Sequence, residues 1–306
     1  MQEQLVEIVL TTYNGETYIA EQLDSLLSQT YKNLRVLVFD DGSTDGTEAI
    51  VKGYVDQHPN IVWHKNERNL GYTMNYLRGL KHTTADYVML CDQDDIWKPE
   101  KVEHTLQKML ENEDKEKNTP ILVFTDAELY GSRIPEGRSF HKTTRLNTKK
   151  VDLNAVLMEN KCIGCTVMIN RALLEHLEHL PKTARVHDWW LALIAAGFGR
   201  IVYLNEMTLF YRQHDHNEIG GTAYTGYVKK RLGAIGAQRE VIRETYRQGT
   251  AFYRMFMAEL PEDKRRVAEV FAEMEHTSFF GRRVRMLRYG FKKSGFIRNV
   301  GLFFLM

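Results

Sequence analysis

Three carboxylates within four positions form the densest group of reactive side chains in this sequence: Asp92, Asp94 and Asp95, with Gln93 between them. They follow the apolar run Tyr87-Val88-Met89-Leu90-Cys91, which is typical of a buried strand that ends here at the surface. Carboxylates this close repel one another unless a cation holds them together. Oxygen ligands at this density suit Mg²⁺ or Mn²⁺, whose remaining positions are filled by water and substrate phosphates. The cluster therefore predicts a divalent metal and a phosphate-bearing substrate.

The acidic residues have two other interpretations. Asp95-Ile96-Trp97-Lys98-Pro99-Glu100 reads as a helix start with proline in its first turn, so the carboxylates could cap a helix, but this leaves their clustering unexplained. A calcium loop of the EF-hand type is excluded because Ile96 stands where the third ligand should be. Residues 41–46 match such a loop better, but its twelfth position is Lys52 where the loop needs Glu.

Composition indicates a globular chain with segregated charge. Residues 226–306 contain 17 Lys and Arg against 8 Asp and Glu, whereas residues 1–225 contain 24 against 32. This segregation suggests a partner for the basic end. No apolar stretch reaches the length of a membrane span and the N-terminus lacks a signal peptide, so we expect a cytoplasmic location.

Cysteine usage agrees with that location. The chain has three cysteines, Cys91, Cys162 and Cys165, and an odd number without a secretory signal predicts reduced thiols. Cys162 and Cys165 have the spacing of a zinc or redox pair. Zinc would need a second pair, however, and residues 166–169 read as a strand rather than the helix of a thioredoxin-like motif. We therefore expect core or lining thiols.

Strand-like and helix-like segments alternate through the first hundred residues, which predicts βαβ crossovers and a mostly parallel sheet with helices on both faces. Ligands bind beyond the carboxyl ends of such strands, and polar residues follow each predicted strand here. We therefore expect one crevice lined by four loops. The predicted strands are residues 5–12, 34–40, 61–64 and 87–91, and the predicted helices are 16–28, 44–57 and 72–82.

The alternation loosens beyond Pro120. A long loop is expected over residues 131–150, and helices follow Gly220-Gly221. In this part the predicted strands are residues 121–125, 164–169, 200–203 and 207–211, and the predicted helices are 189–196, 224–259 and 262–276, before a last basic segment.

Four motifs stand at the strand ends in a fixed order: Val9-Leu10-Thr11-Thr12-Tyr13-Asn14-Gly15, Phe39-Asp40-Asp41-Gly42-Ser43-Thr44-Asp45, Asn69-Leu70-Gly71 and Asp92-Gln93-Asp94-Asp95-Ile96-Trp97. Together they resemble the family 2 inverting glycosyltransferases of the GT-A fold, over residues 5–217. With His187-Asp188-Trp189-Trp190 and Tyr211-Arg212-Gln213-His214, the acidic motif is similar to that of bacterial rhamnosyltransferases that build cell-wall or capsular polysaccharides.

The resemblance implies an α/β fold of the GT-A type. This is a Rossmann-like, mixed and mostly parallel sheet flanked by helices, with a helical C-terminal extension. We expect a catalytic domain over residues 1–220, with a donor half over 1–118 and an acceptor half over 119–220. A helical, basic extension then covers residues 221–306.

The resemblance also implies a nucleotide-binding role for six residues. The carboxylate of Asp41 can accept the imide N–H of uracil or thymine, while the ring of Tyr13 packs on the face of the base. Asp41 has an alternative role as a turn residue or helix cap ahead of Thr44, and the two roles are compatible. The implied nucleotide-binding residues are Thr11, Tyr13, Asp41, Asn69, Gly71 and Asp92.

The metal ligands implied by the resemblance are Asp94, Asp95 and His214. Mg²⁺ or Mn²⁺ held there would bridge the pyrophosphate of the donor and neutralise the leaving nucleoside diphosphate. His214 lies with Arg212 and His216 after a predicted strand, and a structural role for this histidine is the alternative.

An inverting transfer needs a base that takes the proton from the acceptor hydroxyl. The resemblance implies that this base is Asp188, which opens a predicted apolar helix; a simple N-cap is the alternative. Trp189 and Trp190 beside it could stack on an acceptor sugar or belong to the core, and we expect one of each.

The last basic segment, residues 281–306, has seven Lys and Arg, no acidic residue and interleaved apolar side chains. This pattern is typical of an interfacial helix attracted to anionic lipid, so we expect peripheral attachment at the inner face of the membrane. Packing on the catalytic domain or in a homodimer is an alternative. Nucleic acid is a weaker competitor, and we expect none.

We therefore expect a metal-dependent inverting glycosyltransferase. The narrower resemblance indicates L-rhamnose transfer from dTDP-rhamnose, a nucleotide-sugar donor, onto a lipid-linked cell-wall or capsular polysaccharide precursor. UDP-glucose, UDP-galactose or a UDP-N-acetylhexosamine are alternative donors. A nucleotidyltransferase would carry a Gly-rich basic loop after the first strand, where this chain has Thr11-Thr12-Tyr13-Asn14-Gly15-Glu16. A non-catalytic nucleotide-sugar-binding subunit would not need Asp94, Asp95 and Asp188.

Overall fold

The computed structural model describes residues 4–114, 118–131, 134–181, 183–213 and 235–306. The chain forms two compact units and passes between them several times. The first unit comprises Met1–Phe140, Cys162–Leu180 and Val202–Gly220, and the second comprises His141–Lys161, Pro181–Ile201 and Gly221–Met306. The predicted domains, 1–220 and 221–306, remain a proposal.

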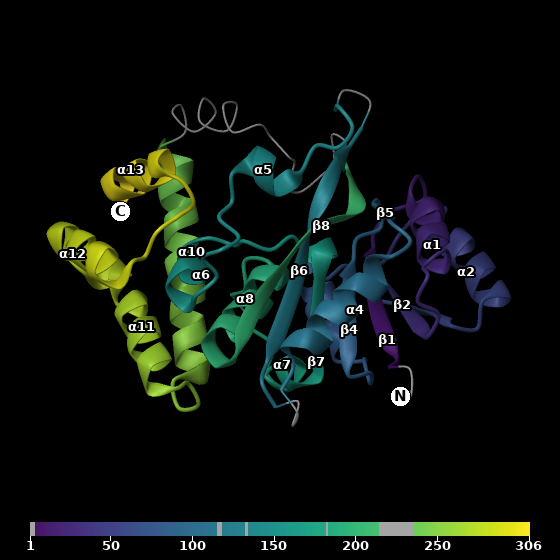
Figure 1. The fold of residues 1–306 in the computed structure, drawn as a ribbon, viewed down its shortest axis with the longest axis horizontal. Coiled ribbons are helices and arrows are strands. Elements are labelled where there is room, and N and C mark those ends of the chain that lie inside the picture. Colours follow the sequence, from purple (N-terminus) through teal and green to yellow (C-terminus); the bar gives the residue numbers. More distant parts are fainter. Residues whose placement is uncertain (1–3, 115–117, 132–133, 182, 214–234) are drawn as a thin grey trace. The chain divides into compact units, whose positions relative to one another are not determined.

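The first unit is built on an eight-stranded sheet in the order β3-β2-β1-β4-β7-β6-β8-β5 (Figure 1). Strands β1 to β4 pair in parallel, whereas β7 pairs antiparallel with β4 and β6. This arrangement confirms the predicted mixed α/β sheet, but its parallel part comprises only β1 to β4, since β5 also pairs antiparallel, with β8. The strands are β1 Val6–Thr12, β2 Leu34–Asp40, β3 Ile61–Lys65, β4 Tyr87–Cys91, β5 Ile96–Trp97, β6 Ile121–Tyr130, β7 Val167–Asn170 and β8 Arg200–Arg212.

The central strands β1 and β4 are buried along their whole length; β4 is apolar throughout, and the buried Glu7 of β1 forms an ion pair with Arg35. Thr12 pairs with Asp40 and Leu10 with Cys91, so the loops that follow β1, β2 and β4 start at one edge of the sheet. Helix α3 packs on β1 and β2, and α4 packs on β6 and β7. The helices of this unit are α1 Ile19–Leu27, α2 Thr47–Gln57, α3 Tyr72–Leu80, α4 Lys101–Asn112 and α7 Arg171–Glu175.

Three sequence-based element predictions are wrong in detail. In the alternative interpretation of the acidic residues a helix starts over residues 95–100; residues 96 and 97 instead form the edge strand β5, whose Trp97 is buried and donates its N–H to Ser25 Oγ at 3.0 Å. This strand pairs with β8, and α4 begins after Pro99, at Lys101. The first residues of the strand predicted at 164–169 form a 3₁₀ turn, η1 Gly164–Thr166, and the two strands predicted between residues 200 and 211 are one strand, β8.

The second unit is helical in its described residues. Its core is aromatic, with Trp190 of α8 against Phe252 and Phe256 of α10. Helices α10 and α11 approach so closely that a Cβ atom on Gly249 would lie 2.3 Å from the ring of Phe271, so only glycine fits there. The helices are α5 Phe140–Thr144, α6 Leu153–Met158, α8 His187–Phe198, α10 Ile235–Phe256, α11 Glu262–Ala272, α12 Phe279–Tyr289 and α13 Phe296–Leu305, with the 3₁₀ turn η2 Met274–His276.

Candidate active site

The loops that follow β1 and β2 are joined by side-chain hydrogen bonds. The N–H of Asn14 donates to Ser43 Oγ at 2.9 Å, and the N–H of Gly15 donates to Thr47 Oγ1 at 2.8 Å. In return, the N–H of Thr44 donates to Asn14 Oδ1 at 2.9 Å. Because each loop satisfies backbone groups of the other, both are held in a fixed position at the edge of the sheet.

Gln93 joins the first of these loops to the acidic segment after β4. Its Oε1 accepts the Thr12 hydroxyl at 2.7 Å and the N–H of Tyr13 at 2.9 Å. Thr11, predicted to bind the nucleotide, is buried, whereas the side chain of Tyr13 is 47% exposed. The Tyr13 ring is thus open to a ligand while its backbone is fixed.

Asp41 is buried and organises the loop after β3. Its Oδ1 accepts Asn66 Nδ2 and the N–H of Leu70, both at 2.8 Å, and its Oδ2 accepts the N–H of Gly71 at 2.9 Å. Gly71 has a φ of +78°, a conformation that favours glycine, and Asn69 Oδ1 also accepts its N–H at 3.0 Å. The structure therefore brings three predicted nucleotide-binding residues together through one carboxylate.

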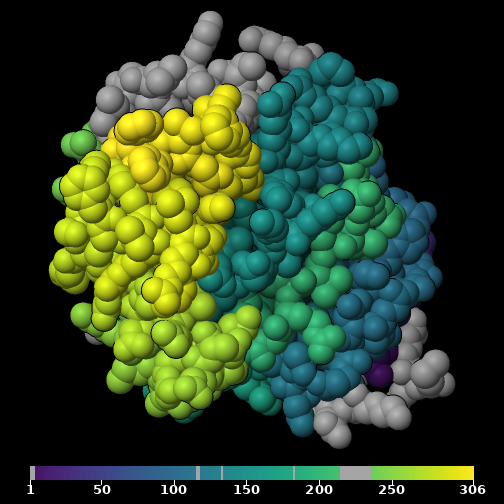
Figure 2. Space-filling view, turned by 60° about the vertical axis from the view of Figure 1, so that its left-hand side comes forward, coloured from purple at the N-terminus to yellow at the C-terminus, as the bar shows by residue number. Residues whose placement is uncertain are grey.

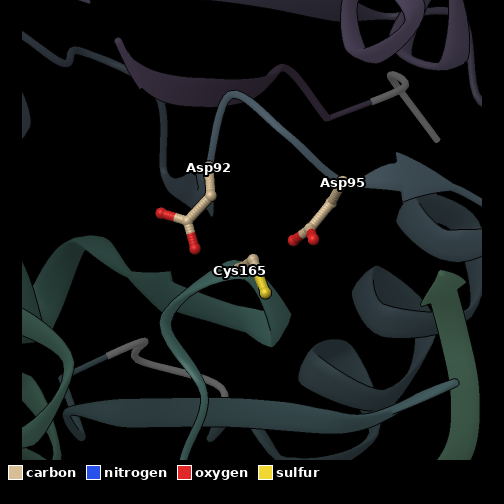
Figure 3. A group of neighbouring side chains, drawn as sticks. All are labelled: Asp92, Asp95 and Cys165. Carbon is tan, nitrogen blue, oxygen red and sulfur yellow. The ribbon is translucent and has the colours of Figure 1, made fainter. Parts of the chain in front are cut away.

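The acidic segment places two of its carboxylates around a thiol (Figure 3). Asp92 and Asp95 lie on either side of Cys165, which comes from η1, and one potential ligand atom from each of the three lies within 4.8 Å of the others. Asp92 Oδ1 accepts the hydroxyl of the buried Tyr76 at 2.7 Å. Asp95 Oδ1 accepts the N–H of Arg212 at 3.2 Å, while the buried Asp95 Oδ2 has no hydrogen-bond partner in the described part of the chain.

The electrostatics of this group are those expected for crowded, buried acids. Burial, together with the charge of Asp94, raises the pKa of Asp92 to about 6. Burial, followed by the charges of Asp94 and Asp92, raises the pKa of Asp95 well above its usual value. Burial, followed by the charges of Asp95 and Asp92, raises the pKa of the Cys165 thiol. A cation here would relieve all of these unfavourable charges.

The other two predicted metal ligands are placed differently. Asp94 is half-buried and lies outside the group formed by Asp92, Asp95 and Cys165, although its backbone oxygen accepts Arg212 Nε at 2.8 Å. His214 lies outside the described residues. Arg212 also forms an ion pair with Glu21, so the end of β8 is tied both to the acidic segment and to α1.

A buried cation lies below the acidic segment. Lys101 is completely buried, with its Nζ 4.6 Å from the centre of the Trp97 ring and 3.2 Å from Thr208 Oγ1. Burial lowers the pKa of Lys101 to about 8, against the opposing influence of Cys165, Cys91 and Asp95. When protonated, Lys101 offsets part of the negative charge of Asp95.

The candidate base, Asp188, belongs to the second unit. Helix α8 begins at His187 and its N-cap is Val186, so Asp188 is not the N-cap that the alternative interpretation required. The Asp188 side chain is 4% exposed, and its Oδ1 accepts the N–H of Trp189 at 2.6 Å. Burial also lowers the pKa of the neighbouring His187 to about 3, which keeps that imidazole neutral.

The two tryptophans after Asp188 are both buried. Trp190 is completely inaccessible and packs in the aromatic core, as expected for one of the pair. Trp189 is 6% exposed, its Nε1 donates to the backbone oxygen of Val156 at 2.6 Å, and the guanidinium of Arg185 lies 5.2 Å from its ring centre. Of the two, only Trp189 retains any exposed surface for a ligand.

Sequence reasoning did not single out several residues that position this site. Gln93 lies inside the acidic motif, but its hydrogen bonds to the β1 loop follow from the packing of the two loops and have no local sequence signal. Cys165 was recognised only as a core or lining thiol, which agrees with its burial. Tyr76 and Lys101 had no signal, because their role follows from their packing beneath the acidic segment.

Comparison with known proteins identifies a family model that covers these residues and relatives that match most of the chain. The model of the glycosyl transferase family 2 matches residues 7–177, which include the loops after β1 to β4 and Cys165. An uncharacterized glycosyltransferase of Rickettsia typhi is 28% identical over 213 residues, 69% of this chain, and this chain spans 64% of its length. The dTDP-rhamnosyl transferase RfbG of Shigella flexneri is 28% identical over 243 residues, 74% of this chain and 78% of that protein.

Among solved structures, the mannosyltransferase PcManGT of Pyrobaculum calidifontis, in complex with GDP-Man and Mn²⁺, is similar with a TM-score of 0.57. The match covers 94% of this chain and 74% of that chain at 18% identity. At this identity the likeness concerns the fold, and it agrees with the predicted GT-A architecture.

Proposed function

Because the chain belongs to glycosyl transferase family 2, we propose that it transfers a sugar from a nucleoside diphosphate donor to a hydroxyl of a glycan acceptor, with inversion at the anomeric carbon. The observation that carries this proposal is the acidic group at the end of β4, in which Asp92 and Asp95 face one another beside the fixed loops of β1 and β2.

The residues fit a divalent metal. Asp95 Oδ2 is buried and lacks a hydrogen-bond partner among the described residues, and the carboxylate of Asp92 lies nearby. Asp95 and Asp92, with Asp94 and His214 from the sequence prediction, would hold Mg²⁺ or Mn²⁺. When bound, such a cation neutralises charge on the leaving nucleoside diphosphate.

The proposed roles in nucleotide binding, proton transfer and acceptor binding belong to the protein's own side chains. The Tyr13 ring packs on the nucleotide base, Asp41 recognises its imide N–H, and Thr11, Asn69 and Gly71 complete the nucleotide site. Asp188 takes the proton of the acceptor hydroxyl as the hydroxyl oxygen bonds to the anomeric carbon of the donor sugar. At the same time the bond between that carbon and the donor phosphate oxygen breaks, and its electron pair leaves with the nucleoside diphosphate. Trp189 and Trp190 are the proposed acceptor side of the site, with Trp189 as the member that a sugar could reach.

We propose dTDP-rhamnose as the donor, because RfbG is named as a dTDP-rhamnosyl transferase and its match covers 74% of this chain. The proposed acceptor is a lipid-linked cell-wall or capsular glycan, so the enzyme would work in the cytoplasm as a peripheral protein at the inner face of the membrane. No helix in the described residues combines the length and apolarity of a membrane span.

The test is a thermal-shift screen of nucleotide sugars with and without Mg²⁺ or Mn²⁺, followed by turnover of the donor that binds. Asp188→Asn should retain the metal-dependent shift and lose turnover by about 10³-fold, the order expected for a missing general base. Asp152→Asn is the matched control, since Asn preserves the N-cap of α6 that Asp152 forms with Ala155 N.

Two results would overturn the proposal. If no nucleotide sugar gave a metal-dependent rise in melting temperature, the donor site would be excluded. Full turnover in Asp188→Asn would exclude that residue as the base. Stabilisation by UDP-sugars rather than dTDP-rhamnose would move the donor to the UDP alternative.

A further inference from the structure

The C-terminal helices carry most of the exposed large apolar side chains in the described part of the chain. Among the described residues, eight of the thirteen exposed large apolar side chains lie on α12 and α13. Figure 2 shows these helices, in yellow, forming part of one face of the molecule. The eight residues are Phe279, Phe280, Val284, Leu287, Phe296, Ile297, Val300 and Phe304.

Their spacing places them on one side of each helix. On α12, Phe280, Val284 and Leu287 follow the i, i+4, i+7 pattern, with exposures of 78%, 62% and 62%. On α13, residues 297, 300 and 304 follow i, i+3, i+7. The opposite sides are buried, through Met286 on α12 and Leu302 on α13. Each helix therefore has two apolar sides, one packed in the second unit and one outside it.

The outer stripes belong to a firmly docked segment. Glu159, which follows α6, accepts Arg298 of α13 at 3.2 Å and the N–H of Ser294 at 2.7 Å, and it forms an ion pair with the buried Lys161. Arg283 of α12 donates to the backbone oxygen of Met306 at 3.1 Å. The exposed stripes are thus held by structure on their inner side and are not the surface of a loose tail.

Positive charge lies beside these stripes. Asn147 donates its N–H to Ser294 Oγ at 2.8 Å and Arg298 donates to the Thr144 oxygen at 2.5 Å, so residues 142–150 pack against the start of α13. That segment has no acidic residue. Exposed cations lie both on residues 142–150 and on the chain from the end of α12 to the start of α13. They are Lys142, Arg145, Lys149, Lys150, Arg288 and Lys292.

We propose that α12, α13 and residues 142–150 form a docking surface for a bilayer that contains anionic lipid. Aromatic and aliphatic side chains of the two stripes enter the interface, and the flanking cations contact the lipid headgroups. Charge complementarity selects this occupant, because residues 142–150 and 281–306 contain no acidic residue, and the ion pair of Arg285 with Glu273 still leaves the exposed cations in excess. Its role in reaching a lipid-linked acceptor rests on the proposed function, but the surface can be tested without substrate.

The test is co-sedimentation of the full chain with vesicles of phosphatidylcholine alone or mixed with phosphatidylglycerol. The wild type should bind the mixed vesicles more tightly. Phe280→Glu with Leu287→Glu, and Ile297→Glu with Phe304→Glu, should each weaken binding at least about tenfold, because a charge replaces inserted apolar surface. Met257→Glu is the control, since Met257 is 49% exposed outside these helices, and it should bind as the wild type does.

A charge arm and a folding check complete the design. Lys149→Gln with Lys150→Gln should weaken binding to the mixed vesicles only. All variants should retain the wild-type melting temperature and donor-induced shift, so that loss of vesicle binding is separable from failure of the glycosyl-transfer proposal. The docking surface would be overturned if the wild type bound neither kind of vesicle. It would also be overturned if both double-glutamate variants bound the vesicles as tightly as the wild type. Dissociation of a dimer by those pairs, with vesicle binding unchanged, would assign the stripes to a second copy.

Discussion

The residues of the candidate site are fixed mainly by hydrogen bonds from uncharged side chains and backbone amides. Gln93, Tyr76 and the backbone amides of the β1 and β3 loops hold Tyr13, Asp92 and Asp41 in place. Asp95 is different, because one of its oxygens is buried without a hydrogen-bond partner in the described chain. An atom in this state is costly in an empty protein and favourable in a metal complex, which is why the acidic group supports the proposed donor site.

The buried His187 should make the free energy of unfolding depend on pH. Its pKa is about 6.5 in the unfolded chain, and burial lowers it to about 3 in the folded protein. Between these values the unfolded state binds more protons, so the free energy of unfolding falls as the pH drops from about 6.5 towards 3. From pH 7 to pH 5 the loss attributable to His187 should be about 2 kcal/mol.

Urea unfolding at pH 7 and pH 5 measures this loss. His187→Asn removes the titrating group, so its two unfolding free energies should differ by about 2 kcal/mol less than those of the wild type. His276→Asn, at an exposed position, controls for the loss of an imidazole. An identical pH dependence in His187→Asn and wild type would contradict the burial of a neutral imidazole at the start of α8.

Much of the site was accessible from the sequence, for a physical reason. Motif residues such as Asp41 and Asp95 closely follow the apolar strands β2 and β4, and parallel strands bring their carboxyl ends together. The supporting residues are another matter. Lys101 beneath Asp95, and Cys165 between the carboxylates, come from segments whose local patterns are ordinary, and only tertiary packing gives them their role.

At the scale of elements, the strands with continuous apolar sequence were the easiest to predict. Residues 34–40 and 87–91 were expected as strands and are β2 and β4. The short edge strand β5 was mistaken for a helix start, because proline and acidic residues give the same local signal at both. Its strand geometry depends on pairing with β8, which lies more than a hundred residues away and leaves no local trace.

The docking of α13 through Glu159 gives a prediction at this scale. Burial alone would raise the pKa of Glu159, but Lys161, together with Ser294 and Arg298, holds it below its usual value. Glu159→Ala leaves two buried cations uncompensated, so it should lower the free energy of unfolding by about 3 kcal/mol. Urea unfolding and amide exchange of α13 measure the effect.

The comparison variant replaces the whole ion group. Combining Glu159→Met, Lys161→Met and Arg298→Met removes all three charges, so this triple variant should be destabilised less than Glu159→Ala alone. If the single and triple variants lost equal stability, packing rather than charge would hold the helix. The basic segment 281–306 is therefore only partly a surface feature, since Arg298 forms an ion pair with the largely buried Glu159.

At the scale of the whole molecule, the two compact units are interleaved along the chain. Helices α6 and α8 precede residue 220, yet they belong to the same unit as α10 to α13. Trp190 of α8 is completely buried, with Phe252 and Phe256 of α10 as its aromatic neighbours. A sequence boundary at a Gly-Gly pair marks a change in composition, but it does not show which helices share a core.

This interleaving predicts the behaviour of the fragment 1–220. Without α10 and α11, the apolar faces of α6 and α8 are exposed, and each large side chain uncovered costs about 2 kcal/mol. The fragment should bind a hydrophobic dye and unfold over a broad urea range, whereas the full chain unfolds cooperatively. The fragment 1–277 retains α10 and α11 and should keep a cooperative transition, although the loss of Arg298 weakens it. A monomeric fragment 1–220 with a sharp transition and a metal-dependent donor shift would instead make it an independent catalytic domain, with residues 221–306 as a dispensable membrane adaptor.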